Sequence, residues 1–207
     1  MQFSRDQSET LIEIMKWRRD VRHFSSTPIP EDVMTRLGEA MELSPSVGNS
    51  RPWRVLRIRD EDRRARVSEL FERCNKEAAA SYTGEARQEY LKLKLAGLRE
   101  APEHLAFFTE TEPQEGRGLG RQTMPETLFY STVMAMHTLW LAARAENIGL
   151  GWVSILEPGE LAGILDAEDS WRFTGYLCLG YPTFTDAEPL LHRKQWQSNK
   201  QSVWATR

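Results

Sequence analysis

Apolar residues recur at helical spacing in two segments near the start of the chain. Leu11, Ile14 and Met15 share one face of a helix that we expect to end near Arg18. A second helix is predicted for "PEDVMTRLGEAMEL", which begins at Pro30 and carries acidic residues in its first turn. The stretch "SPSVGNSRPW" follows, and its prolines and glycine end the helical pattern.

Four later runs have the length and apolar content of β-strands, and helical patterns separate them. The expected strands are 53–58, 104–109, 149–156 and 171–182. The expected helices are two charged segments, 60–79 and 84–100, an apolar helix from Glu126 to about Asn147 that stops at Gly149, and a short helix at 158–166. This order of elements predicts one α+β domain with a central sheet of about four strands.

The apolar helix contains the longest apolar run of the chain, "TLFYSTVMAMHTLWLAA". This run is shorter than the roughly 20 residues that a membrane-spanning helix needs, and it includes several hydroxyl side chains and His137. We therefore expect a helix that is buried in the core or in a subunit interface, and no association with a membrane.

Composition narrows the class of protein. Hydrophobic residues make up 40% of the chain, which is enough for a substantial core. The net charge of −3 argues against a nucleic-acid-binding protein, so any basic cluster must act locally. Cys74 and Cys178 fit no disulfide or metal-site spacing. Together with a polar N-terminal stretch, these features predict a cytoplasmic protein without a metal site.

The motif "RRDVRHF", directly after the first helix, concentrates charge. Arg18, Arg19 and Arg22 surround a single carboxylate, that of Asp20, and His23 adds another basic side chain. Cations are favoured at the C-terminal end of a helix, so a solvated helix end is one interpretation. In the other, the arginine forks bind a phosphomonoester, and Asp20 either pairs with them or acts as a base that they keep ionised.

Three further motifs have glycines or hydroxyl side chains typical of ligand-binding loops. In "SPSVGNSRPW", Gly48 lets the backbone approach a flat ligand, and Asn49 and Ser50 could hydrogen-bond to its edge. In "GLGWVSIL", Ser154 could lie beside a ring or could instead bond to the backbone of a buried strand. "GRGLG" fails as a dinucleotide-binding motif, because no helix begins at its third glycine and no acid follows about 20 residues later. We expect a mobile loop there.

Five segments, taken in order, resemble one known family. They are "RRDVRHF", "SPSVGNSRPWR", "LKLAGLREAPEHLAFF", "MPETLFYSTVMAMHTLWLAARAENIGLGWVSIL" and "GYLCLGYP". The series covers about Met15 to Trp196 and resembles the flavin-dependent nitroreductase superfamily. Within that superfamily it is most similar to the family of 5,6-dimethylbenzimidazole synthases.

The resemblance implies a fold and a reaction. The fold would be a nitroreductase-like α/β sandwich with a central mixed sheet flanked by helices, in a domain-interleaved homodimer with flavin at the subunit interface. Residues 1–207 would form one domain, with a helical lid at 62–98 and a C-terminal extension at 183–207. The family converts reduced FMN and O2 into 5,6-dimethylbenzimidazole, the lower ligand of cobalamin, and erythrose 4-phosphate. FMN would then be a substrate, reduced by NAD(P)H at this site or by a separate flavin reductase.

Roles for individual residues also follow from the resemblance. Asp20 would be a catalytic residue that takes up protons, and Ser154 a catalytic residue beside the reactive nitrogen of the flavin. The other implied FMN contacts are Arg18, Arg19, Val21, Arg22, Ser50 and a lid residue that we take as Leu95, with Arg193 or Lys194 as a further phosphate ligand.

Two other functions share many of these features. An FMN-dependent NAD(P)H nitro or enone reductase would retain its flavin and would need no carboxylate base near the ribityl chain. A flavin carrier would bind FMN without transforming it. Asp20 and Ser154 favour the synthase over the reductase, and survival of oxidised flavin in air would indicate the carrier.

Overall fold

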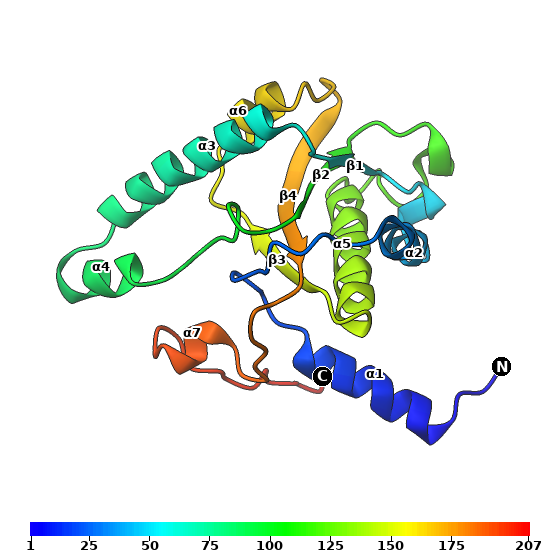
Figure 1. The fold of residues 1–207 in the computed structure, drawn as a ribbon. Helices are drawn as coiled ribbons and strands as arrows, with labels where there is room; N and C mark the ends of the chain where they lie inside the picture. Colours follow the sequence, from blue (N-terminus) through cyan, green and yellow to red (C-terminus); the bar gives the residue numbers. More distant parts are fainter.

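A four-stranded antiparallel sheet forms the centre of the computed structural model, which describes all residues from Met1 to Arg207 (Figure 1). Its strands, in the spatial order β1-β2-β4-β3, are β1 (Trp53–Arg57), β2 (Glu103–Glu110), β4 (Trp171–Gly180) and β3 (Gly149–Val153). The predicted α+β class and the four strands are confirmed.

The prediction of a mixed sheet is wrong, because all three strand pairings are antiparallel. The helices between β1 and β2, and the helix between β3 and β4, are inserted into hairpin-type connections. They do not form the crossovers that parallel neighbours require. The one parallel pairing is an isolated bridge between Asp20 and Leu150.

Helices cover both faces of the sheet, as the sandwich prediction requires (Figure 1). One face packs on α2 (Glu31–Met41) and α5 (Thr127–Ala145), and the other packs on α3 (Glu61–Ala80) and α6 (Pro158–Ile164). Side chains of β2 alternate between the two layers: Phe107 joins the core beneath α5, and Phe108 joins the core beneath α3. Every residue of β2 is therefore buried.

The first helix, α1 (Arg5–Trp17), ends directly before the basic motif, as predicted. Ser4 and Gln7 form a capping box at its start. The helix packs against α5, yet none of its residues is buried in the single chain.

One predicted helix end and one predicted stop residue are wrong. The second charged helix, α4 (Gly84–Leu91), stops nine residues before the predicted end at 100, because tertiary contacts hold the backbone beyond it. The apolar helix α5 ends at Ala145, two residues before the predicted end near Asn147. The residue that takes the left-handed conformation after it is Asn147, with φ of 59°, and not Gly149, which already belongs to β3. No helix combines the length and the apolar character needed to cross a membrane.

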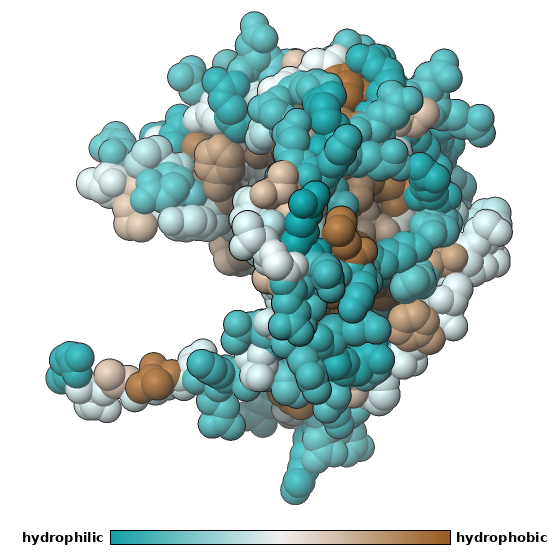
Figure 2. Space-filling model, turned by 90° about the vertical axis from the view of Figure 1, so that its left-hand side faces the viewer, coloured by the Kyte–Doolittle hydropathy of each residue, from teal (hydrophilic) through white to brown (hydrophobic).

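The C-terminal extension contains a short helix, α7 (Leu190–Arg193). Figure 2 shows the side of the molecule on which α4 and α7 lie, and most of its surface is hydrophilic. Residues 197–207 are all exposed.

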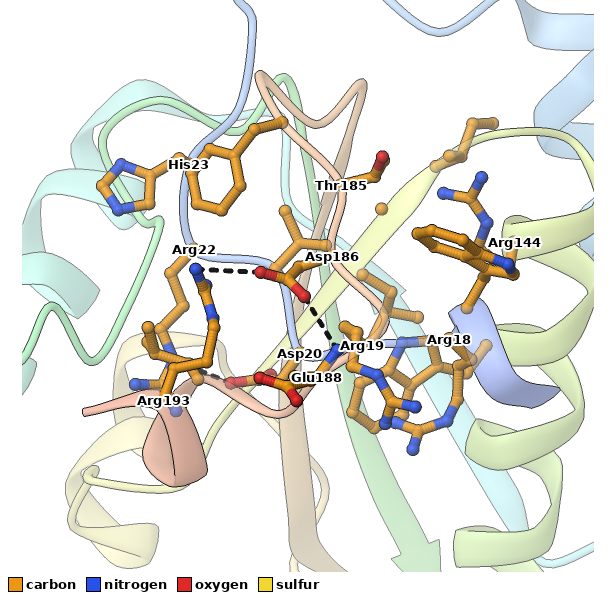
Figure 3. Close-up of a pocket in the computed structure, with 18 residues that line it drawn as sticks. Arg18, Arg19, Asp20, Arg22, His23, Arg144, Thr185, Asp186, Glu188 and Arg193 are labelled. Carbon is orange, nitrogen blue, oxygen red and sulfur yellow. Dashed lines mark hydrogen bonds and ion pairs between the residues drawn. The ribbon is translucent and has the colours of Figure 1, made fainter. Parts of the chain in front are cut away.

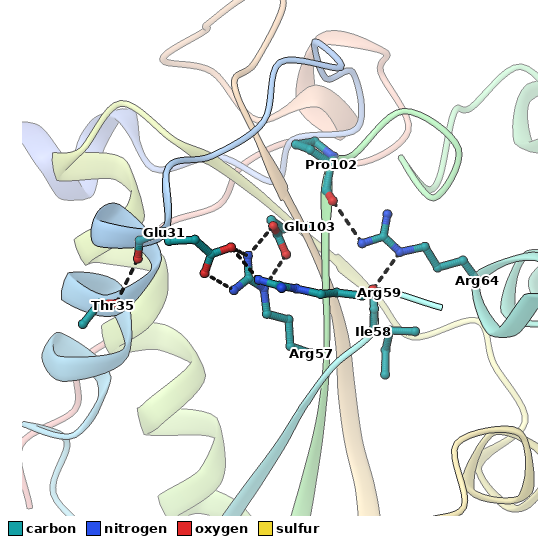
Figure 4. A network of polar contacts seen from close by, with 8 residues as sticks. All are labelled: Glu31, Thr35, Arg57, Ile58, Arg59, Arg64, Pro102 and Glu103. Carbon is teal, nitrogen blue, oxygen red and sulfur yellow. Dashed lines mark hydrogen bonds and ion pairs between the residues drawn. The ribbon is translucent and has the colours of Figure 1, made fainter. Parts of the chain in front are cut away.

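An ion-pair network joins the start of α2 to one end of the sheet (Figure 4). Arg57 on β1 bridges two carboxylates, with 2.7 Å from Nη1 to Glu31 Oε2 and 2.7 Å from Nε to Glu103 Oε2. Arg64 on α3 donates to the backbone carbonyls of Ile58 and Pro102. These contacts position α2 and α3 relative to the ends of β1 and β2.

Candidate active site

The basic motif leaves α1 and lies along β3. The N–H of Val21 donates to the carbonyl of Leu150 at 3.0 Å, next to the Asp20–Leu150 bridge. Gly151 makes this approach possible, because a Cβ at that position would lie 2.1 Å from the carbonyl oxygen of Val21. At Gly149 a Cβ would meet the Val21 side chain at 2.8 Å. The glycines of "GLGW" therefore serve the close contact between two chain segments.

The carboxylate of Asp20 is held by two hydrogen bonds. Oδ1 accepts from the backbone N–H of Trp152 at 2.8 Å, and Oδ2 accepts from Nε of Arg22 at 2.7 Å. The Asp20 side chain remains 30% exposed. The acid is thus fixed in orientation and still accessible from the adjacent pocket.

Arg22 connects this carboxylate to the segment that follows α4. Its side chain is 14% exposed, and Nη1 donates to the carbonyl of Lys94 at 2.8 Å. Gly97 packs beside Phe24 and the Arg22 carbonyl, where a side chain would not fit. The neighbouring Leu95 is half-buried. The structure therefore brings the predicted lid contact close to the basic motif.

A hollow that opens to solvent adjoins the motif, and 18 residues line it (Figure 3). Five of the predicted contacts line it: Arg18, Arg19, Asp20, Val21 and Arg22. The side chains that the sequence-based prediction missed are chiefly Trp140 and Arg144 from α5, and Phe184, Asp186 and Glu188 from the C-terminal extension.

Positive charge dominates this pocket. Five arginines face three carboxylates, and two of those carboxylates are already paired, Asp20 with Arg22 and Asp186 with Arg193 at 2.9 Å. Arg193 thus lines the pocket, whereas Lys194 does not. A phosphate ester, which carries almost two negative charges at neutral pH, suits the cations that remain.

Three arginines of the pocket, Arg18, Arg19 and Arg144, have no carboxylate partner. The guanidinium of Arg18 lies 4.7 Å from the ring centre of Trp140, and burial together with the adjacent charge of Arg19 lowers the pKa of Arg18. Arg19 donates from Nη2 to the carbonyl of Lys16, while its buried Nε has no partner. An unsatisfied buried donor among cations fits an anionic ligand such as a phosphate.

Ser50 lies outside this pocket. It follows the short 3-10 helix η1 (Val47–Asn49), and its side-chain oxygen is buried without a hydrogen-bond partner. The N–H of Val47 donates to Ser131 at the start of α5, whereas Arg18 stacks on Trp140, nine residues along the same helix. Nine residues correspond to about 14 Å. Ser50 and the arginines therefore belong to different ends of α5.

Ser154 is exposed and follows the end of β3, two residues after Trp152. It does not line the hollow beside the basic motif. Its predicted position beside a flavin ring stays a prediction.

One of the pocket residues that the sequence-based prediction missed could have been recognised from the sequence. Arg144 is a cation in the last turn of an otherwise apolar helix. The contributions of Phe184, Asp186 and Glu188 had no such signal, because they depend on how the C-terminal extension folds back over the basic motif.

Comparisons with known proteins agree with this architecture. The nitroreductase family model matches residues 15–181. The 5,6-dimethylbenzimidazole synthase of Rhodobacter capsulatus is 49% identical over the full length of both chains, and the protein of that name from Rhodospirillum rubrum is 49% identical over 90% of this chain and 89% of its own. The crystal structure of oxidized iodotyrosine deiodinase bound to FMN and 3-iodo-L-tyrosine is similar in fold, with a TM-score of 0.73 and 20% identity over 95% of this chain and 97% of that one. This chain belongs to the nitroreductase family, and within it to the family of 5,6-dimethylbenzimidazole synthases.

Proposed function

We propose that this protein converts reduced FMN and O2 into 5,6-dimethylbenzimidazole and erythrose 4-phosphate, and so consumes FMN as a substrate. The observation that carries the proposal is the placement of one fixed carboxylate, Asp20, at the wall of a pocket rich in arginine. A protein that only stores or reduces flavin does not need a carboxylate held at this point.

In this proposal the two kinds of side chain have separate tasks. Arg18, Arg19 and Arg193 bind the phosphate and offset its charge. Asp20 accepts protons as bonds of the substrate break, because its carboxylate is accessible and cannot rotate away. Arg22 holds both Asp20 and the lid segment, which helps to keep water out of the reacting volume.

The proposed assembly is a domain-interleaved homodimer. Large apolar side chains on α1 and α5 are exposed in the single chain, as expected for surfaces that a second copy covers. They are Leu11, Ile12, Met15, Trp17, Tyr130 and Met134. Ser50, with its unsatisfied hydroxyl, would complete the flavin site of the partner subunit rather than that of its own.

Sedimentation velocity tests this assembly. The wild type should sediment as a dimer, and Met134→Glu should sediment as a monomer because it places a charge on the proposed interface. The control Leu91→Glu changes an exposed leucine on α4 and should remain dimeric. A monomeric wild type would refute the dimer.

Turnover experiments test the function and the source of electrons. The protein is incubated in air with FMN and NAD(P)H, with and without a separate flavin reductase. Formation of 5,6-dimethylbenzimidazole and irreversible loss of flavin support the synthase. Consumption of NAD(P)H with complete conservation of flavin would instead support a reductase.

A further inference from the structure

Three aromatic rings connect the lid to the C-terminal extension. Tyr82 and Tyr90 are stacked, with ring centres 4.9 Å apart, and Trp196 meets them at ring-centre distances of 5.5 and 6.2 Å with steeply inclined planes. Tyr90 also donates from its hydroxyl to Asn75 on α3 at 2.6 Å. We refer to Tyr82, Tyr90 and Trp196 as the aromatic cluster.

The cluster includes the buried side chain of α4. Tyr90 is the single buried residue of that helix, and α3 is the element against which the helix mainly packs. Without Trp196, one side of the tyrosine pair would lose its covering. The position of α4 thus depends on a residue that lies more than a hundred positions later in the chain.

Trp196 is rigidly linked to the pocket. The N–H of Trp196 donates to the carbonyl of Leu191 at 3.0 Å, and that of Lys194 donates to the carbonyl of Leu190 at 2.9 Å. These bonds hold residues 190–197 as one compact turn, in which Arg193 and Trp196 are three residues apart. Arg193 lines the arginine-rich pocket and pairs with Asp186.

A second connection reaches the lid at the other end of α4. Arg22, also a pocket residue, donates to the carbonyl of Lys94. Arg22 thus contacts the segment after α4 directly, and Arg193 is linked to α4 through the turn that carries Trp196.

We propose that Trp196 is a positioning residue that holds the lid, and that the turn 190–197 couples phosphate binding in the pocket to the order of the lid. The coupling rests on the proposed function, since it assumes that FMN phosphate occupies the arginine-rich pocket. Without ligand, Asp186 holds Arg193. A phosphate offers a stronger charge-assisted partner, immobilises Arg193 and orders the turn that carries Trp196.

Hydrogen exchange of the backbone amides in residues 82–96 tests this proposal on the full-length protein. The samples are unliganded protein and protein saturated with oxidised FMN or with riboflavin, which lacks the phosphate. The variants are Trp196→Ala, Trp196→Phe and Arg193→Gln. Trp204→Ala is the matched control, because Trp204 lies in the same extension and is 95% exposed.

In the wild type and in Trp204→Ala, FMN should slow exchange of this segment more than riboflavin does. Trp196→Ala should exchange about tenfold faster without ligand, because two aromatic contacts are lost, and should show no extra protection by FMN. Trp196→Phe should recover most of the protection. Arg193→Gln should keep the unliganded protection and lose the difference between FMN and riboflavin.

Two results would overturn the proposal. Equal exchange in Trp196→Ala and wild type would remove the positioning role, and equal protection by FMN and riboflavin in the wild type would remove the coupling to phosphate. Because the experiment involves no turnover, its failure would leave the synthase proposal standing. Loss of the synthase proposal through turnover data would likewise leave the lid contact standing.

Discussion

The carboxylate of Asp20 accepts a hydrogen bond from the backbone N–H of Trp152, 132 residues later in the chain, at 2.8 Å. This bond attaches the basic motif to β3, so that the acid is oriented by the backbone of the sheet and not by a mobile side chain. Arg22 holds the second carboxylate oxygen. The two candidate motifs of the sequence, "RRDVRHF" and "GLGWVSIL", are thus in direct contact with each other.

Replacing Asp20 with Asn should separate binding from chemistry. The amide oxygen can still accept from Trp152, so the variant should fold and should bind FMN with similar affinity. Formation of 5,6-dimethylbenzimidazole should fall at least about a hundredfold, because the proton acceptor is lost. Product is measured by mass spectrometry, and full activity in this variant would refute the role of Asp20 as a base.

Arg19→Ala should weaken binding of FMN and leave riboflavin affinity nearly unchanged. Loss of a charge-assisted contact to phosphate should reduce FMN affinity about tenfold to a hundredfold. Isothermal titration calorimetry with both flavins measures the difference. Equal losses for the two ligands would show that Arg19 does not contact the phosphate.

Gly151→Ala should disrupt the contact between β3 and the basic motif. The added Cβ would lie 2.1 Å from the Val21 carbonyl oxygen, so the chain segments must separate. We expect a loss of about 3 kcal/mol in the free energy of unfolding, with loss of activity. Gly38→Ala is the control, since no atom lies within 4 Å of its added Cβ and the change on α2 should be neutral or stabilising. Urea unfolding of both variants measures the effect, and equal stability would contradict this account of the glycine.

His104 should make stability depend on pH. Its ring is fully buried, with Nδ1 at 2.9 Å from the Tyr176 hydroxyl and no hydrogen-bond partner for Nε2. Burial, together with the positive charge of Arg64, lowers the pKa of His104 to about 4. In the unfolded chain the histidine binds a proton below about pH 6.5, whereas the folded chain does so only near pH 4. Stability present at neutral pH is therefore lost as the pH falls through this window.

Because of His104, the free energy of unfolding should fall by about 2 kcal/mol when the pH is lowered from about 7.5 to 5. Urea unfolding at both pH values measures it. The His104→Phe variant should not show this fall in stability with pH. The Tyr176→Phe variant should still show it, although its free energy of unfolding should be lower at every pH. An unchanged pH dependence in His104→Phe would refute the assignment.

Local patterns in the sequence predicted those elements whose limits depend on local interactions. The periodicity of Leu11, Ile14 and Met15 placed α1, and the apolar run from Thr127 placed α5. The end of α4 could not be predicted in this way, because the contact between Arg22 and Lys94, and the fit of Gly97 beside Phe24, depend on tertiary structure.

In the candidate site, too, contiguous residues could be predicted from the sequence, whereas residues from distant parts of the chain could not. The motif from Arg18 to Arg22 is contiguous, and the structure keeps it together in one pocket. Trp140 and Asp186 reach that pocket from distant parts of the chain, and no local pattern indicates that they do. Ser50 was predicted as a contact of the same ligand, and its distance from the arginines becomes consistent with that role only if a second chain takes part.

A single-turnover experiment with reduced FMN distinguishes consumption of the flavin from its reuse. Protein is mixed with one equivalent of chemically reduced FMN under argon, air is admitted, and the small molecules are identified by mass spectrometry. If the protein consumes FMN, 5,6-dimethylbenzimidazole and erythrose 4-phosphate should appear as flavin disappears. Full recovery of oxidised FMN together with hydrogen peroxide would contradict it and would leave a reductase or a flavin carrier in its place.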